Sequence, residues 1–399
     1  MRKTLFILLM AVGLSSCGGS GSSASWLTTE GREGSFLSST VELDQQFVYA
    51  LSADRGELLA YKVAEEEAGG HDHGHVHAQH DHDDEHDHEH EHDHEQGTDL
   101  DLVELDGSPY RLADGSAQSL VLVSGGKALI VLFSDGMLRS YPIDGVTGLL
   151  AEPSAVDSQV NSPRALRVSP EGDAVAVLGD SLAIFPLPED GGLPSQPALL
   201  PDTANWSDLA LGHHGGAGAT VTGAIGFSWQ RGGPITLGSE TALPGTARAG
   251  LALSHDELFV VNSQDRSVSK LHFDEDNATL MLVETFSLPE ELTDPSVVTV
   301  LSDGEELLVG GADALILLHR HDDDWEEEGH LELDQEITAL YAVPSSNSVL
   351  VAHALGHGFH LVQVEHSLTA LAELAPEHSG ITSFGVADRA EVVTVTEQI

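Results

Sequence analysis

Cationic residues, cysteine and aromatic residues are all scarce in this chain of 399 residues. Lys and Arg number 16 against 65 Asp and Glu, which gives a formal net charge of −49. Such a charge argues against nucleic acids and anionic membrane surfaces as partners, and it suits soluble cations or a well-solvated surface. The single cysteine, Cys17, excludes an intramolecular disulfide.

Familiar catalytic motifs are missing as well. The chain contains no G-x-S-x-G nucleophile elbow, no phosphate-binding P-loop and no Gly-rich dinucleotide fingerprint. It also has no amphipathic helix pattern of useful length. The sequence therefore favours an all-β protein that is not an enzyme.

The N-terminus carries an export signal. Two basic residues precede an apolar run over residues 5–12, which is too short to span a bilayer. The run leads into Leu14-Ser15-Ser16-Cys17, which resembles the lipobox of bacterial lipoproteins. The resemblance implies that a signal peptide of residues 1–16 is removed, that Cys17 carries lipid, and that residues 17–35 form a flexible tether. We therefore expect a lipoprotein of the bacterial cell envelope, anchored to a membrane through Cys17; an ordinary secretory signal with a chance cysteine is the alternative.

Beyond the tether, one unit repeats along the chain. Each unit has at least three short apolar strands separated by Gly, Asp or Ser turns, and the clearest units are residues 165–187 and 251–273. A period of about 40–45 residues is typical of four-stranded propeller blades. The predicted first strands begin 41 to 47 residues apart, near Ser119, Pro163, Ser207, Ala249, Ser296, Ile337 and Gly380.

The two ends of the repeat region together complete one blade. Residues 46–63 and 98–106 supply three of its strands, but its innermost strand is weak in the N-terminal sequence. The segment Gly380–Thr396 offers further strands, so we predict that C-terminal strands pair with the N-terminal blade and close the ring. The prediction is a seven-bladed β-propeller over residues 36–399, with eight blades or a pair of β-sandwiches as the alternatives.

One unit resembles a known repeat. The stretch LFVVNSQDRSVSKLHFD (258–274) is similar to the repeat of the YVTN and lactonase-like propellers, in which a strand ends in Asn before a polar turn and a Val-Ser strand. The resemblance implies sugar-lactone hydrolysis as an alternative function. Arg266 and His357 are the candidates for it, because both are predicted in turns between second and third strands. No repeat ends in Trp-Asp, so the WD40 class is not indicated.

The stretch from His71 to Glu95 alternates histidine with Asp or Glu and contains no Lys or Arg. Neutral imidazole is a common ligand for Zn, Ni, Cu and Co, and alternate residues of an extended chain point the same way. The carboxylates can ligate directly or orient the rings. We predict a disordered metal-binding loop over residues 65–97, inserted in the first blade, with Zn(II) as first choice and Ni(II), Cu(II) or Co(II) as alternatives. A solvated acidic insert without a metal role is the plain alternative. The predicted ligands are His71, His73, His75, His77, His80, His82, His86, His88, His90, His92 and His94.

Other histidines are predicted to share a face with this tract. Neighbouring strands of a blade are antiparallel, so turns from first to second strand and from third to fourth strand leave at one face. His213 and His214 lie in such a turn among glycines, which let the backbone turn freely, and we predict a defined metal site there, close to the propeller axis. In the acidic hairpin of residues 319–325, His319 and His321 are a weaker candidate, together with Asp322–Asp324. The remaining histidines predicted on this face are His255, His272 and His366, whereas His353 and His357 belong to the opposite face.

These features together resemble the periplasmic zinc metallochaperones, seven-bladed propellers that hand zinc to the substrate-binding protein of an ABC transporter. The resemblance rests on the export signal, the His/Asp segment before TDLDLVEL (98–105), and the turn at His213-His214. It implies buffering or delivery of a divalent transition metal at the envelope, with that substrate-binding protein as a partner. We expect no nucleic-acid binding, and no membrane contact except through the N-terminal lipid. A lactonase-like hydrolase, and a protein-interaction platform with an incidental histidine tract, stay open as alternatives.

Overall fold

A computed structural model describes residues 46–65 and 100–388, apart from short gaps at 54, 113–115, 189–190, 232, 246–247, 302–303, 322–323, 334–335, 343–347, 354–358, 365–366 and 374–380. Every regular element in these residues is a β-strand. Within this part of the chain there is no helix of the length and apolarity needed to cross a membrane. The predicted signal peptide, Cys17, the tether and the histidine tract lie outside the described residues.

The described strands form seven sheets, numbered here along the chain. Sheet 1 has the order β29 (Ile381–Asp388), β1 (Gln46–Ser52), β2 (Glu57–Glu65), β3 (Leu100–Glu104), and the short β4 (Tyr110–Arg111) also pairs with β2. In the other six sheets the strands follow one another in chain order. Sheet 2 contains β5 (Ala117–Val123), β6 (Ala128–Phe133), β7 (Met137–Pro142) and β8 (Ser154–Asp157). Sheet 3 contains β9 (Ala165–Val168), β10 (Ala174–Leu178), β11 (Leu182–Pro186) and β12 (Ala198–Leu200).

Sheets 4 to 7 repeat this plan. Sheet 4 contains β13 (Trp206–Leu211), β14 (Gly215–Thr220), β15 (Gly223–Ser228) and β16 (Thr236–Ala242). Sheet 5 contains β17 (Arg248–Ser254), β18 (Glu257–Asn262), β19 (Ser267–Asp274) and β20 (Thr279–Ser287). Sheet 6 contains β21 (Val297–Leu301), β22 (Glu306–Gly310), β23 (Ala314–His321) and β24 (Asp324–Glu332). Sheet 7 contains β25 (Ile337–Ala342), β26 (Ser348–His353), β27 (Phe359–Val364) and β28 (Leu368–Glu373).

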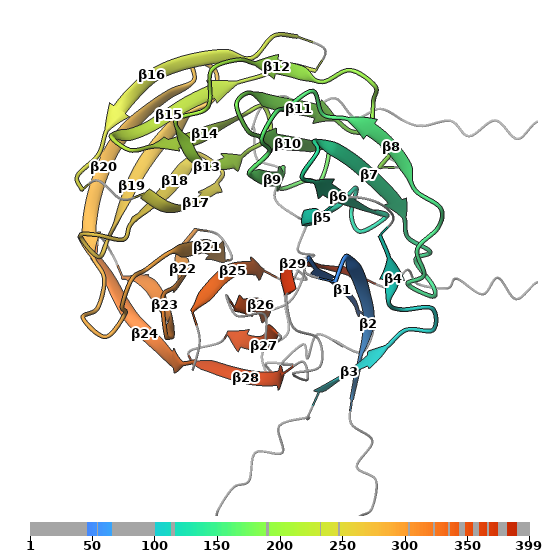
Figure 1. Cartoon of the computed structure of the whole chain (residues 1–399). Coiled ribbons are helices and arrows are strands. Elements are labelled where there is room, and N and C mark those ends of the chain that lie inside the picture. Colours follow the sequence, from blue (N-terminus) through green and yellow to red (C-terminus); the bar gives the residue numbers. More distant parts are fainter. Residues whose placement is uncertain are drawn as a thin grey trace, which may run out of the picture. The chain divides into compact units, whose positions relative to one another are not determined.

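The first strands of the sheets meet around a common axis. In ring order β29, β5, β9, β13, β17, β21 and β25 each contact the next, and β25 contacts β29 again. Figure 1 shows these strands around the centre, with the fourth strands at the rim. The fold is therefore a β-propeller, and the seven sheets of the described residues match the predicted seven blades.

The ring closes where the two ends of the described chain meet. Strand β29 pairs antiparallel with β1, from Gln46 opposite Asp388 to Ser52 opposite Ile381. A C-terminal strand thus takes the innermost position of sheet 1, ahead of three strands from the N-terminal part of the chain. This confirms the predicted closure.

The hydrophobic cores lie between neighbouring sheets. Along β6, Leu129, Val131 and Phe133 pack into the cluster shared with sheet 1, whereas Ala128, Ile130 and Leu132 pack into the cluster shared with sheet 3. Successive residues of a strand point to opposite sides. A blade's second strand is covered on both sides, so it reads as an unbroken apolar run such as ALIVLF.

Glycine fits the inner strands of sheet 4 for a steric reason. A Cβ added at Gly218 in β14 would lie 2.0 Å from a carbon of the Trp206 ring. The indole of Trp206 also stacks on Phe227 at a centroid distance of 5.9 Å. Gly218 therefore leaves the space in which the first-strand tryptophan packs against its own sheet.

One face of the propeller carries the turns from first to second strand and from third to fourth strand, and we call it the tract face. Residues 66–99 connect the third strand β2 to the fourth strand β3, whose ends pair at Glu65 and Leu100. The insertion that holds the histidine tract therefore leaves and re-enters sheet 1 at this face, as predicted from the strand order.

Candidate functional site

A cavity of about 510 Å³ opens on the tract face between sheets 2, 3 and 4. All its walls come from first-to-second or third-to-fourth turns, which is why residues distant in sequence meet there. Two cations and two carboxylates line it in a chain with few cations. The lining residues are Ser124, Lys127, Glu171, Gly172, Asp173, Leu187, Pro188 and Arg231.

Backbone and side-chain hydrogen bonds fix the walls of this cavity. Gly172, at a positive φ of 68°, accepts a hydrogen bond from the backbone N–H of Ser124 at 2.9 Å, which ties the turns of sheets 2 and 3 together. The hydroxyl of Ser169 donates to the Asp173 carboxylate at 2.6 Å. Arg231 Nη2 donates to the carbonyl oxygen of Leu187 at 2.7 Å, so sheet 4 supplies a guanidinium held against sheet 3.

His213 lies beside the cavity and contacts its wall. Its Nε2 is 3.2 Å from Oε1 of Glu171, and both side chains are about half exposed. The contact joins the first-to-second turn of sheet 4 to the corresponding turn of sheet 3. A carboxylate at one ring nitrogen favours the tautomer in which Nδ1 is the acceptor. His213 and Glu171 therefore form a solvent-accessible base and the group that orients it.

His214 does not join this pair. Its ring is 6.3 Å from that of His213 and packs edge-on against Trp229, with centroids 6.0 Å apart. Its backbone N–H donates a short hydrogen bond to the Glu275 carboxylate. The geometry thus separates the two histidines that the sequence nominates as one metal site.

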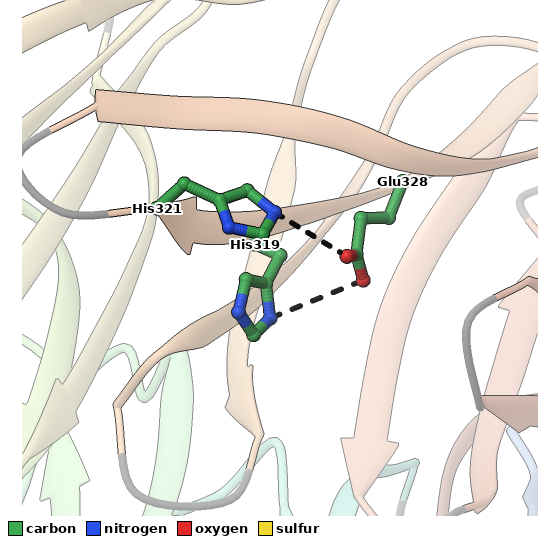
Figure 2. Close-up of side chains that lie close together, drawn as sticks. All are labelled: His319, His321 and Glu328. Carbon is green, nitrogen blue, oxygen red and sulfur yellow. Dashed lines mark ion pairs between the residues drawn. The ribbon is translucent and has the colours of Figure 1, made fainter.

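A different pair of histidines does converge. His319 and His321, at the end of β23, lie with Glu328 of β24 so that one ligand atom from each residue is within 4.8 Å of the other two (Figure 2). The hairpin was predicted as a weaker candidate with Asp322–Asp324 as the carboxylates. Asp322 and Asp323 lie outside the described residues, and Glu328 was missed because a β-bulge, which sequence does not reveal, brings it there.

The other histidines predicted on the tract face have ordinary local partners. His255 has φ 51° in the first-to-second turn of sheet 5, and its Nδ1 is 3.3 Å from the Ser254 hydroxyl. His272 pairs with Asp256 at 3.2 Å, and both are well exposed. His366 lies outside the described residues.

The residues predicted for lactone hydrolysis are not gathered into a site in the described structure. Arg266 lies in a second-to-third turn with φ 46°, and its Nη1 donates to the backbone carbonyl of Glu290 at 2.9 Å. This contact stabilises the segment that follows β20. His357 lies outside the described residues. A cluster of histidine, arginine and carboxylate groups does exist, but at the cavity on the opposite, tract face.

Comparison with known proteins bears on the fold. No family model matches the sequence, and no curated protein matches it either. Among solved structures, a putative 6-phosphogluconolactonase from Bacteroides fragilis aligns with a TM-score of 0.62 and 13% identity, over 88% of this chain and 99% of that chain. The periplasmic gluconolactonase of Pseudomonas aeruginosa aligns with a TM-score of 0.62 and 14% identity, over 86% of this chain and 99% of that chain. A protein of unknown function from Desulfotomaculum acetoxidans aligns with a TM-score of 0.63 and 8% identity, over 86% of this chain and 99% of that chain. At these identities the likeness shows the fold alone, a β-propeller.

Proposed function

We propose that this protein hydrolyses a small lactone, of the sugar-acid type, in the cavity on the tract face. The observation that carries the proposal is the pair of His213 and Glu171, 3.2 Å apart, beside a cavity that also holds Lys127 and Arg231. The sequence alone favours a protein that is not an enzyme. The cavity, and the lactonase names of two structural neighbours, support the alternative.

Lactone hydrolysis is the attack of water on the carbonyl carbon of a ring ester. His213 Nδ1 takes a proton from the attacking water while Glu171 holds the ring and stabilises its charged form. The tetrahedral oxyanion then collapses, the ring C–O bond breaks, and the alkoxide oxygen takes up the proton. Lys127 and Arg231 supply positive charge for the oxyanion.

The test is acid release from glucono-1,5-lactone by the full chain, measured above spontaneous hydrolysis. His213→Asn should lower kcat by about a hundredfold, which is the usual contribution of a general base, and Glu171→Gln by less. The matched control is His255→Asn, another histidine in a first-to-second turn of the tract face, at a backbone conformation that Asn tolerates. Equal rates in all three variants, or none above background in the native chain, would rule the proposal out.

We also propose metal binding by the histidine tract, which the sequence favours independently of the cavity. Eleven histidines lie between His71 and His94, most of them separated by Asp or Glu, and the insertion begins and ends at the tract face. Zinc is the first candidate, held by many weak and equivalent sites and passed to other carriers at the cell envelope. Membrane attachment through Cys17 and delivery to the substrate-binding protein of a zinc ABC transporter belong to the same proposal.

Zinc titration calorimetry on the native chain, compared with a tract-silenced chain, tests this second function. The tract-silenced chain is the full chain in which the eleven tract histidines are replaced by Asn. Loss of most of the bound zinc supports the tract as the chelator, and unchanged stoichiometry contradicts it. Radiolabelled lipid incorporation that survives Cys17→Ser would contradict the anchor.

A further inference from the structure

A group of metal-ligand side chains lies at the β23–β24 hairpin of sheet 6, apart from both the cavity and the tract. His319 and His321 are two residues apart on one strand, so their rings point to the same side. Their ring centroids are 4.7 Å apart. In Figure 2 both rings face the carboxylate of Glu328, which comes from the neighbouring strand.

A β-bulge supplies the carboxylate. The pairing of β23 with β24 shifts between Leu317 opposite Gly329 and Leu318 opposite Glu327, which leaves Glu328 as the extra residue. Such a bulge puts two consecutive residues of one strand on the same side. Glu328 therefore lies on the same side of the sheet as His319 and His321. Regular pairing resumes with Gly329 opposite Leu317.

The distances suit a small divalent ion. His321 Nε2 is 3.5 Å from Glu328 Oε1, and His319 Nδ1 is 3.9 Å from Glu328 Oε2. Ligand atoms at zinc distances of about 2.0–2.1 Å in tetrahedral geometry are roughly 3.4 Å from one another. All three ligand atoms lie within 4.8 Å of one another, so side-chain movements on the order of an ångström would bring them to coordination distance.

Two of the inward atoms have no hydrogen-bond partner. His319 Nδ1 and Glu328 Oε2 are buried atoms that make no hydrogen bond in the described structure. Buried polar atoms are usually satisfied, so an unsatisfied nitrogen and oxygen that face each other point to a missing shared partner. A divalent cation is a partner that both can bind.

A second carboxylate adjoins the group. Glu306 of β22 is the cross-strand partner of His319, and its Oε1 lies 3.6 Å from His319 Nδ1. Among the described residues, Glu306 and Glu328 form ion pairs with histidines and with no Lys or Arg. These two carboxylates add negative potential where the imidazoles converge, and this also favours a bound cation.

The contrast with sheet 5 argues against an ordinary surface ion pair. There His272, also near the end of a third strand, meets one carboxylate, Asp256, and the side chains are 45% and 62% exposed. His319 and Glu328 are 26% and 22% exposed, whereas His321 is 53% exposed. The sheet 6 group thus differs from its counterpart by a second histidine, by the lower exposure of His319 and Glu328, and by unsatisfied atoms.

We propose that His319, His321 and Glu328 form a site for a divalent transition-metal ion, with Zn(II) or Co(II) as the fitting ions. The donors are two neutral imidazole nitrogens and one carboxylate oxygen, a set that both ions accept. Three protein ligands leave a coordination position open to water or to an exchanging ligand. Glu306, whose Oε1 lies 3.6 Å from the same ring nitrogen of His319, enters the fourth position in place of water. This inference does not depend on the proposed lactonase activity.

The experiment titrates the tract-silenced chain with Co(II) and Zn(II), because the native tract would mask one further site. We expect one equivalent of Co(II) with the visible absorption of a four-coordinate ion, displaced by one equivalent of Zn(II). His321→Ala and Glu328→Gln should each weaken zinc binding by at least tenfold, as loss of a ligand or its support typically does. Glu328→Gln changes neither size nor shape, so a folding defect is not expected from it.

The matched controls are His272→Gln, at the corresponding strand of sheet 5, and His213→Asn. Both should bind zinc within about twofold of the parent, and the metal-free melting temperature of every variant should match the parent. No stoichiometric site in the tract-silenced chain would overturn the proposal. Loss of the site in His213→Asn but not in His321→Ala would overturn it too, and would place the metal at the His213-His214 turn.

Discussion

The turn pair His213-His214 and the strand pair His319 and His321 behave in opposite ways. The turn residues are adjacent in sequence, yet their rings are 6.3 Å apart and take different partners, Glu171 for one and Trp229 for the other. The strand residues have Arg320 between them, yet their rings are 4.7 Å apart and meet the same carboxylate. The rings of the adjacent residues His213 and His214 point apart, whereas those of His319 and His321, two residues apart, converge.

Backbone geometry explains the difference. Consecutive residues in an extended or turning chain point to different sides, whereas residues two apart in a strand point to the same side. A His-x-His pattern on a strand is therefore a better metal signal than His-His in a turn. The same rule applies to the tract, in which most histidines are spaced by two.

The largest expected effect is on the number of zinc ions bound, because it compares the tract with the two histidine pairs. Replacing the eleven tract histidines with Asn should reduce bound zinc from roughly four to six ions to about one, given two to four ligands per ion in the tract. Equilibrium dialysis with metal analysis measures this directly. A tract-silenced chain that still binds several ions would mean that the described histidines, not the tract, dominate metal binding.

The next largest effect comes from measuring both lactone turnover and zinc affinity in a variant of each histidine pair. His213→Asn should lower lactone turnover by about a hundredfold and leave zinc affinity in the tract-silenced chain unchanged. His321→Ala should do the reverse. If either substitution lowers lactone turnover and zinc affinity to the same degree, the two histidine pairs act as one site.

A third change strains the sheet that holds the turn pair. Gly218→Ala places a Cβ against the Trp206 ring, and overpacking of this kind costs about 2 kcal/mol of unfolding free energy. Urea denaturation of the tract-silenced chain should show it, with Co(II) absorption at sheet 6 retained before unfolding. Gly233→Ala, whose Cβ would meet nothing closer than 3.4 Å, is the control and should leave the midpoint unchanged.

A fourth effect is on thermal stability. Zinc in hundredfold excess over its Kd adds about 2.7 kcal/mol to unfolding and should raise the melting temperature of the tract-silenced chain by about 4 °C. Glu328→Gln should remove this rise, and His272→Gln should keep it. Differential scanning calorimetry with and without zinc is the measurement. A rise that persists in Glu328→Gln would place the stabilising ion elsewhere.

Most of the architecture could be predicted from sequence because blades are local units. The observed first strands begin within two residues of their predicted starts, as at Ala117, Ala165 and Ile381. Runs such as ALIVLF show which strands are covered on both sides. Ring closure followed from the weak innermost strand of the N-terminal blade, since a propeller has to fill that position.

The sites were harder to predict because they depend on details between strands. Asp324 and Glu326 lie opposite His321 and His319 in the strand pairing, and the bulge further along β24 adds Glu328 to the group. The cavity joins turns of three sheets, and no local pattern links Lys127, Glu171 and Arg231.

The point at which the histidine insertion leaves the propeller has a consequence for how such a protein could be adapted. Glu65 and Leu100 are paired, so the inserted segment spans no distance and strains no strand, whatever its length. Closing a loop costs only about 0.6 kcal/mol more for each doubling of its length. Gain or loss of His-Asp units could thus change the length of the tract, and with it the metal capacity that we propose, while the seven-sheet ring stays as it is.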